Sequence, residues 1–170
     1  MTSPQQLLEP IIRGMCNHPD SLEIQEDDSD DSTKLTLLPH TADYRIICGK
    51  QGRQIKALQF LAKALSDRSG NGKPMTLELR ESFVGDMEEH RPFKPNPKFD
   101  PEACKALVQT FVNALFGRAV ITHASFNRRR ATLHVTIENE PDESAAVAAM
   151  GDVFYPYGYG QGCILKISTK

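Results

Sequence analysis

The spacing of apolar and polar residues predicts a mixed order of helices and strands in the first half of the chain. Six elements are expected, in the order helix, strand, strand, helix, helix and strand, over residues 4–16, 21–25, 34–38, 41–48, 53–66 and 75–80. Pro4 suits the start of the first helix, whereas Pro10, which suits a helix interior poorly, would place that start near Leu7. The acidic run 26–31 is expected to form the loop between the first two strands.

The second half predicts a similar order. Asp100 and Pro101 suit the start of a helix, and Gly117 suits its end. Two strands, an alanine-rich helix, a glycine- and tyrosine-rich loop and a last strand are expected after it, over residues 119–126, 131–138, 142–154, 155–162 and 163–168. Four prolines between residues 91 and 101 predict a stiff linker, which Phe93 and Phe99 would pin to a domain surface.

The two halves therefore share one pattern, which repeats after about 85 residues. The pattern predicts an α+β fold of two α-β-β-α-(α)-β units, each a three-stranded sheet with helices on one face. The expected boundaries are residues 1–88 for the first domain, 89–100 for the proline-rich linker and 101–170 for the second domain.

The segment Gly49-Lys50-Gln51-Gly52 lies between an apolar stretch and a basic helix. Glycine has no Cβ and accepts φ > 0, so such a turn lets a nucleic-acid backbone come close. The first N–H groups of the following helix lack intrahelical partners and would face a phosphate at the turn. Two glycines also occur in plain connectors between helices, so the charge around them decides between the two interpretations.

That charge favours a polyanion. Between Tyr44 and Lys73 the chain has seven basic residues and one acidic residue, Asp67, a formal charge of +6. The whole chain carries −2, so the remainder carries −8. The overall charge argues against nucleic acid, whereas this local concentration of positive charge argues for it.

The ten residues from Gly49 to Leu58 resemble the hallmark of a KH domain, and the order α-β-β-α-α-β is similar to its type II (prokaryotic) arrangement. The same run, with Asn17-His18-Pro19-Asp20 before it, is similar to the small bacterial KH RNA-binding proteins of the KhpA type. The resemblance covers residues 5–81, although Cys48 stands where that family usually has isoleucine or leucine. Family members are about half this length. The second half would be a degenerate KH-like copy, because its region 138–143 is acidic and lacks both glycines.

The resemblance implies a set of nucleic-acid-binding residues: Ile47, Gly49, Lys50, Gln51, Gly52, Arg53, Ile55, Lys56 and Leu58. The glycines would permit close approach of the strand, and the basic residues would neutralise its phosphates. The apolar residues would line a groove for the bases, with the strand 75–80 opposite. A KH glycine loop clamps the backbone of about four nucleotides.

For three other features of the sequence, two interpretations stay open. Phe60 lies between Lys56 and Lys63 at helical spacing, and it belongs to a solvated basic face or anchors the second half or another chain. The tyrosines of segment 155–162 serve loop packing or base stacking. A hairpin tip carries three arginines that form a solvated turn or an auxiliary phosphate contact, Arg128, Arg129 and Arg130.

No arrangement of side chains in the sequence indicates catalysis, a metal site or a cofactor. The four cysteines are far apart, which is typical of reduced thiols in the cytoplasm. No apolar run reaches the ~20 residues of a membrane helix, and the N-terminus has no basic region before an apolar stretch, as a secretory signal would.

The sequence therefore favours a non-catalytic, cytoplasmic RNA-binding protein that holds short single-stranded RNA through the glycine turn. Two alternatives stay open. One is a protein-interaction or assembly module that keeps a KH fold without using it on RNA, with Phe60 or the second half as its contact. The other is binding of single-stranded DNA.

Overall fold

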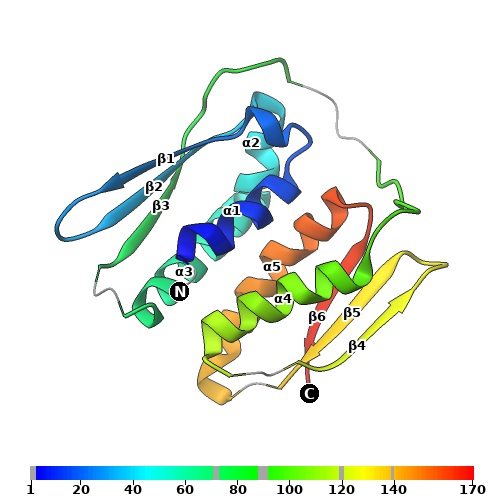
Figure 1. Ribbon diagram of the computed structural model, residues 1–170. Coiled ribbons are helices and arrows are strands. Elements are labelled where there is room, and N and C mark those ends of the chain that lie inside the picture. The colour runs from blue at the N-terminus through cyan, green and yellow to red at the C-terminus, as the bar shows by residue number, and fades with distance from the viewer. Residues whose placement is uncertain (1–2, 71–72, 88–91, 119–120, 139) are drawn as a thin grey trace.

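The computed structural model describes residues 3–70, 73–87, 92–118, 121–138 and 140–170. Its four long helices lie together in the middle of the molecule, with a three-stranded sheet on each side (Figure 1). The core between these layers is continuous and includes residues from both halves of the chain. None of the described helices is long and apolar enough to cross a membrane.

The first unit has six main elements: α1 (Pro4–Met15), β1 (Glu23–Asp28), β2 (Thr33–Leu38), α2 (Thr41–Cys48), α3 (Arg53–Arg68) and β3 (Met75–Leu79). Single 3₁₀ turns, η1 (Pro19–Ser21) and η2 (Lys50–Gly52), precede β1 and α3. The strand order is β1-β2-β3, with β1 antiparallel and β3 parallel to β2. The first unit thus has the predicted order of helices and strands.

The second unit repeats this topology: α4 (Pro101–Phe116), β4 (Ile121–Asn127), β5 (Thr132–Ile137), η3 (Pro141–Glu143), α5 (Ser144–Gly160) and β6 (Ile164–Thr169). Its strand order is β4-β5-β6, with β4 antiparallel and β6 parallel to β5. In the described part of this unit, the short turn η3 stands where the first unit has α2. The predicted α+β fold of two similar units is confirmed, although residues 119–120 of a predicted strand and residues 89–91 of the linker lie outside the described residues.

The start of α1 distinguishes the two predicted positions, Pro4 and Leu7. The Ser3 hydroxyl accepts a hydrogen bond from the Gln6 N–H (3.2 Å), and the Gln6 side chain accepts one from the Ser3 N–H (2.9 Å). This reciprocal cap starts the helix at Pro4 and leaves Pro10 inside it. The predicted start at Pro4 is confirmed, and the alternative near Leu7 was wrong because a strong cap and the burial of Leu7 and Leu8 outweigh one missing hydrogen bond.

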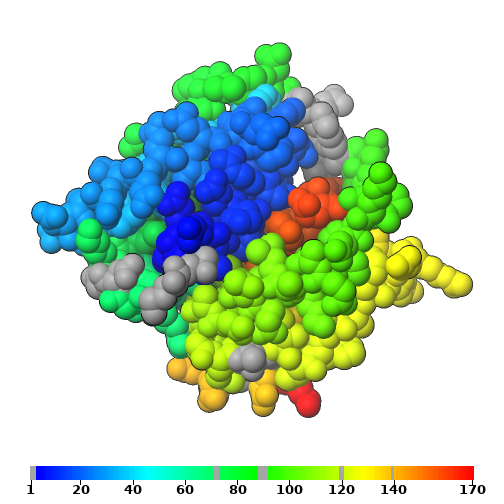
Figure 2. Space-filling model, viewed as in Figure 1, coloured from blue at the N-terminus to red at the C-terminus, as the bar shows by residue number. Residues whose placement is uncertain are grey.

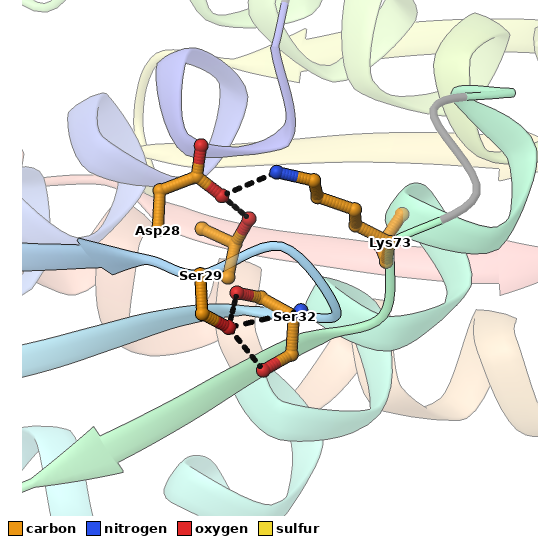
Figure 3. A network of polar contacts seen from close by, with 6 residues as sticks. Asp28, Ser29, Ser32 and Lys73 are labelled. Carbon is orange, nitrogen blue, oxygen red and sulfur yellow. Dashed lines mark hydrogen bonds and ion pairs between the residues drawn. The ribbon is translucent and has the colours of Figure 1, made fainter.

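The acidic run is also not a loop throughout. β1 begins two residues later than predicted and extends to Asp28, which lies opposite Thr33 of β2. The Asp28 carboxylate accepts hydrogen bonds from the Thr33 hydroxyl (2.9 Å) and from Lys73 Nζ (3.2 Å), while Ser29 and Ser32 close the turn (Figure 3). These local partners extend the hairpin into the acidic segment.

The glycine- and tyrosine-rich segment is helical rather than a loop. α5 continues through Pro156 to Gly160, six residues beyond the predicted end. Its last turns pack on α1, where a Cβ added to Gly160 would lie 2.2 Å from the Gly14 carbonyl oxygen. The Gln161 side chain also donates a hydrogen bond to that oxygen (3.0 Å). Packing between the units therefore stabilises a helical end that local propensity disfavours.

The described part of the linker, residues 92–100, packs on the second unit through Phe93 and Phe99, as predicted. The Phe93 ring lies 5.1 Å from that of Tyr159, and the Phe99 ring lies 5.5 Å from that of Phe126, measured between centroids. The Asp100 carboxylate then caps α4 by accepting hydrogen bonds from two backbone N–H groups of its first turn.

Candidate nucleic-acid interface

The glycine turn (residues 49–52) joins α2 to α3 through left-handed backbone. Positive φ values occur at Gly49 (76°), Gln51 (56°) and Gly52 (73°). The Gly49 N–H ends α2 by donating to the Arg45 carbonyl oxygen (2.9 Å), and the Gly52 N–H donates to the Gly49 carbonyl oxygen (3.1 Å). A Cβ at Gly49 would lie 2.9 Å from the Gln54 backbone nitrogen, and the positive φ strains any side chain, so glycine is favoured there.

The turn is accessible and leads into an open helix end. Lys50 and Gln51 are exposed, and the two glycines are half-buried. No side chain among the described residues caps the first turn of α3. The Arg53 N–H donates to the Lys50 carbonyl oxygen, so α3 offers an anion at the turn the N–H groups after Arg53 and the positive end of its dipole.

The side chains of the implied groove are less accessible than expected. Ile55 is half-buried and can present an apolar surface beside the turn. Ile47 and Leu58 have no exposed surface, because α2 and α3 direct them into the core against the sheet. The expectation that these two residues line an open groove was wrong, and helical periodicity alone could not separate a groove-facing position from a core position.

The basic segment does not form one patch. Lys50, Lys56 and Lys63 are exposed and make no ion pair with any described residue. Lys73 pairs with Asp28 at the opposite end of α3 from the glycine turn. The positive charge near the turn is therefore smaller than the sequence total suggests.

The second unit contributes an acidic residue to the edge of the turn. Asp152 of α5 accepts a hydrogen bond from Arg53, with 2.8 Å between Oδ1 and Nη2. This hydrogen bond raises the pKa of Arg53, and the attraction of the nearby carboxylate adds to the effect. The Arg53 side chain remains 71% exposed, so it is partly neutralised but accessible.

A buried carboxylate that the sequence analysis did not single out fixes α2. Asp43 is fully buried and accepts hydrogen bonds from the backbone N–H groups of Asn17 and His18, each at 2.8 Å. His40 Nδ1 accepts from the Ala42 N–H, and its ring stacks on that of His18 with 4.0 Å between centroids. These contacts tie the end of α1 to the start of α2, and they join two histidines that showed no relation in the sequence.

In the second unit, the region that corresponds to the glycine turn is acidic. Glu140 and Glu143 form a reciprocal cap at η3, and Arg118 pairs with both carboxylates. The β4–β5 hairpin, yellow in Figure 2, projects from the surface. Its tip carries three exposed arginines, Arg128, Arg129 and Arg130.

The tyrosines of α5 differ in environment. Burial raises the pKa of Tyr157 to about 12, and its ring packs against Phe154. Tyr159 packs against the linker through Phe93, whereas Tyr155 is 49% exposed. Two of the three rings therefore pack against other parts of the protein. Within the described ranges, no group of three or more His, Cys, Asp or Glu side chains could hold a metal ion.

The first unit, with its accessible glycine turn between two helices and its type II order of elements, is a KH-type module. The family model for the KH domain of KhpA/KhpB matches residues 5–79. The chain belongs to this KH-domain family.

Three relatives show how far the likeness extends. The chain is 32% identical over 75 residues to the RNA-binding protein KhpA of Thermotoga maritima, which covers 96% of that protein and 44% of this chain. It is 34% identical over 62 residues to KhpA of Halalkalibacterium halodurans, covering 82% of that protein and 36% of this chain. It is 30% identical over 77 residues to KhpA of Listeria monocytogenes, covering 99% of that protein and 45% of this chain. The family match ends at residue 79, before the second unit begins.

Proposed function

We propose that the first unit binds single-stranded RNA at the glycine turn. The observation that carries the proposal is an exposed turn of left-handed backbone directly before α3, with a Lys50 cation that pairs with no described residue. The relatives named above are RNA-binding proteins, and their similarity lies in this unit.

Binding would use backbone contacts first. Phosphates approach the turn at Gly49 and Gly52, where no Cβ intervenes, and the N–H groups that follow Arg53 in the first turn of α3 donate to them. Lys50 and Lys56 neutralise phosphate charge, Arg53 contributes less because Asp152 pairs with it, and Ile55 offers the apolar surface beside the turn. Binding should weaken with salt, with log K falling by ~0.7 per neutralised phosphate for each tenfold rise in salt concentration.

In this role the protein holds RNA without changing it chemically, and it acts in the cytoplasm. The RNA-binding unit ends at residue 88, and its degenerate copy begins at residue 101. The three arginines of the β4–β5 tip act as an auxiliary phosphate contact for a longer strand, because they are exposed on a projecting hairpin.

The test replaces Lys50 and Gln51 with Asp. Aspartate tolerates the left-handed backbone at position 51, so the turn should fold. The matched control is Lys94→Asp with Lys98→Gln, two exposed linker positions, which lowers the formal charge by the same three units. We expect the first variant to lose salt-sensitive binding of an RNA oligonucleotide in fluorescence anisotropy and the control to keep it.

Equal affinities of the folded turn variant, the control and the wild type would refute the clamp. Wild-type protein that purifies free of RNA and binds no oligonucleotide at low salt would instead support the assembly module, which the clampless second unit favours. A competition between matched RNA and DNA strands distinguishes the third possibility, because the 2′-OH separates them.

A further inference from the structure

The exposed face of α3 continues away from the glycine turn as a stripe of basic and aromatic residues. Arg53, Lys56, Phe60 and Lys63 are all exposed. At about 100° per residue their side chains fall within an arc of about 80°. Phe60 has 44% of its surface exposed, between two lysines that pair with no described residue.

Along most of this stripe, the neighbouring surface of α5 carries short, uncharged side chains. The Arg53–Asp152 contact places the middle of α5 beside the start of α3. Arg68 at the end of α3 approaches Gly117 after α4, and Arg118 pairs with Glu143 before α5, so the two helices run antiparallel. The residues of α5 that lie beside Lys56 to Lys63 are therefore small: Ala145 and Ala148 are exposed, and Gly151 is half-buried.

This combination is suited to a nucleic-acid strand. Cations on both sides of a ring neutralise phosphates while the ring stacks on a base, and stacking of this kind tolerates any base. Small neighbours leave room for a base to lie flat on the ring. The charge complementarity of the stripe thus favours a polyanion over an apolar protein surface at Phe60.

We infer that α3 extends the RNA path beyond the glycine turn and that Phe60 stacks on a base of the bound strand. This inference rests on the proposed function of the turn. Phe60 lies about 12 Å along the helix from Gly52. This distance spans three or four nucleotides at the ~3.4 Å rise of a stacked strand. With the four nucleotides of the clamp, the footprint is about seven or eight nucleotides.

The experiment compares an eight-nucleotide RNA with the same strand made abasic over four nucleotides at either end. The intact strand and the two abasic strands have the same phosphates, so differences in affinity among them report base contacts. The full-length wild type should bind the intact strand at least about fivefold more tightly than one of the abasic strands, the low end for one stacked base. Phe60→Ala should remove that preference, and Phe60→Trp should restore it.

Phe83→Ala is the matched control, because Phe83 is 82% exposed and lies outside α3. It should leave the preference unchanged. The inference would be overturned, and the clamp left intact, by either of two results. One is a wild type that binds the intact strand and both abasic strands equally tightly, and the other is a Phe60→Ala variant that keeps the preference for the intact strand. A shift of the protein's oligomeric state by Phe60→Ala, with no change in RNA affinity, would identify Phe60 as a protein contact instead. If the wild type showed no salt-sensitive binding of any of these RNA strands, the proposed function itself would be refuted.

Discussion

Replacement of Asp152 by Asn should strengthen RNA binding. In the wild type the Asp152 carboxylate lies 2.8 Å from Arg53, so it competes with a phosphate for the same guanidinium. Asparagine keeps the size of the side chain and removes the negative charge. Arg53 would then be free to neutralise one more phosphate at the first turn of α3.

The magnitude follows from the exposure of the pair. Since Arg53 is 71% exposed, water and salt screen the pair, and its removal changes the RNA affinity by only about two- to fivefold at 0.1 M salt. The salt dependence is the sharper readout. One additional neutralised phosphate makes the slope of log K against log salt concentration steeper by about 0.7.

The assay is fluorescence anisotropy with a labelled oligonucleotide, repeated over a range of salt concentrations. Asp142→Asn is the control, because Asp142 is an exposed acidic residue of the same unit near the far end of α5. In an Arg53→Ala background, Asp152→Asn should have no more effect than this control. Weaker RNA binding by Asp152→Asn would refute the reasoning and show that Asp152 orients Arg53 for the phosphate rather than competing with it.

Three further predictions concern stability and accessibility. Gly160→Ala should destabilise the protein by about 1–3 kcal/mol in urea unfolding, because the new Cβ would press on the α1 backbone; an unchanged midpoint would contradict the tight crossing of α1 and α5. Asp43→Ala should lower the free energy of unfolding by about 1–3 kcal/mol, since two backbone N–H groups lose their acceptor, and Asp20→Ala at an exposed position is the control. In native protein a thiol reagent should modify Cys48 first. Burial raises the pKa of Cys16 and of Cys104 to about 12, and it also raises the pKa of Cys163. Equal modification rates for all four cysteines would contradict this burial.

Local signals predicted most of the fold. The α4 cap at Asp100, the end of that helix at Gly117 and the bounds of α2 follow from residues within one turn of each boundary. The end of α5 does not, because Pro156, Gly158 and Gly160 disfavour a helix unless α1 packs against it. That contact joins residues almost 150 positions apart, as in the hydrogen bond from Gln161 to Gly14.

In the candidate site, likewise, the local features could be predicted from the sequence and the long-range contacts could not. The turn and its cations were apparent because they are contiguous in the sequence. The burial of Ile47 and Leu58, the carboxylate of Asp43 and the pairing of Arg53 with Asp152 depend on how distant elements pack. Sequence periodicity shows which residues share a helix face, but it does not show which neighbour covers that face.

The continuous core has a consequence for how this molecule behaves on dilution. Two separate chains that covered each other's helices would come apart as their concentration fell, by mass action. Here both partners belong to one polypeptide, so the local concentration of each around the other is fixed by the tether. Even a scarce copy in a large volume therefore retains the carboxylate of Asp152 beside Arg53, whatever the abundance of the protein.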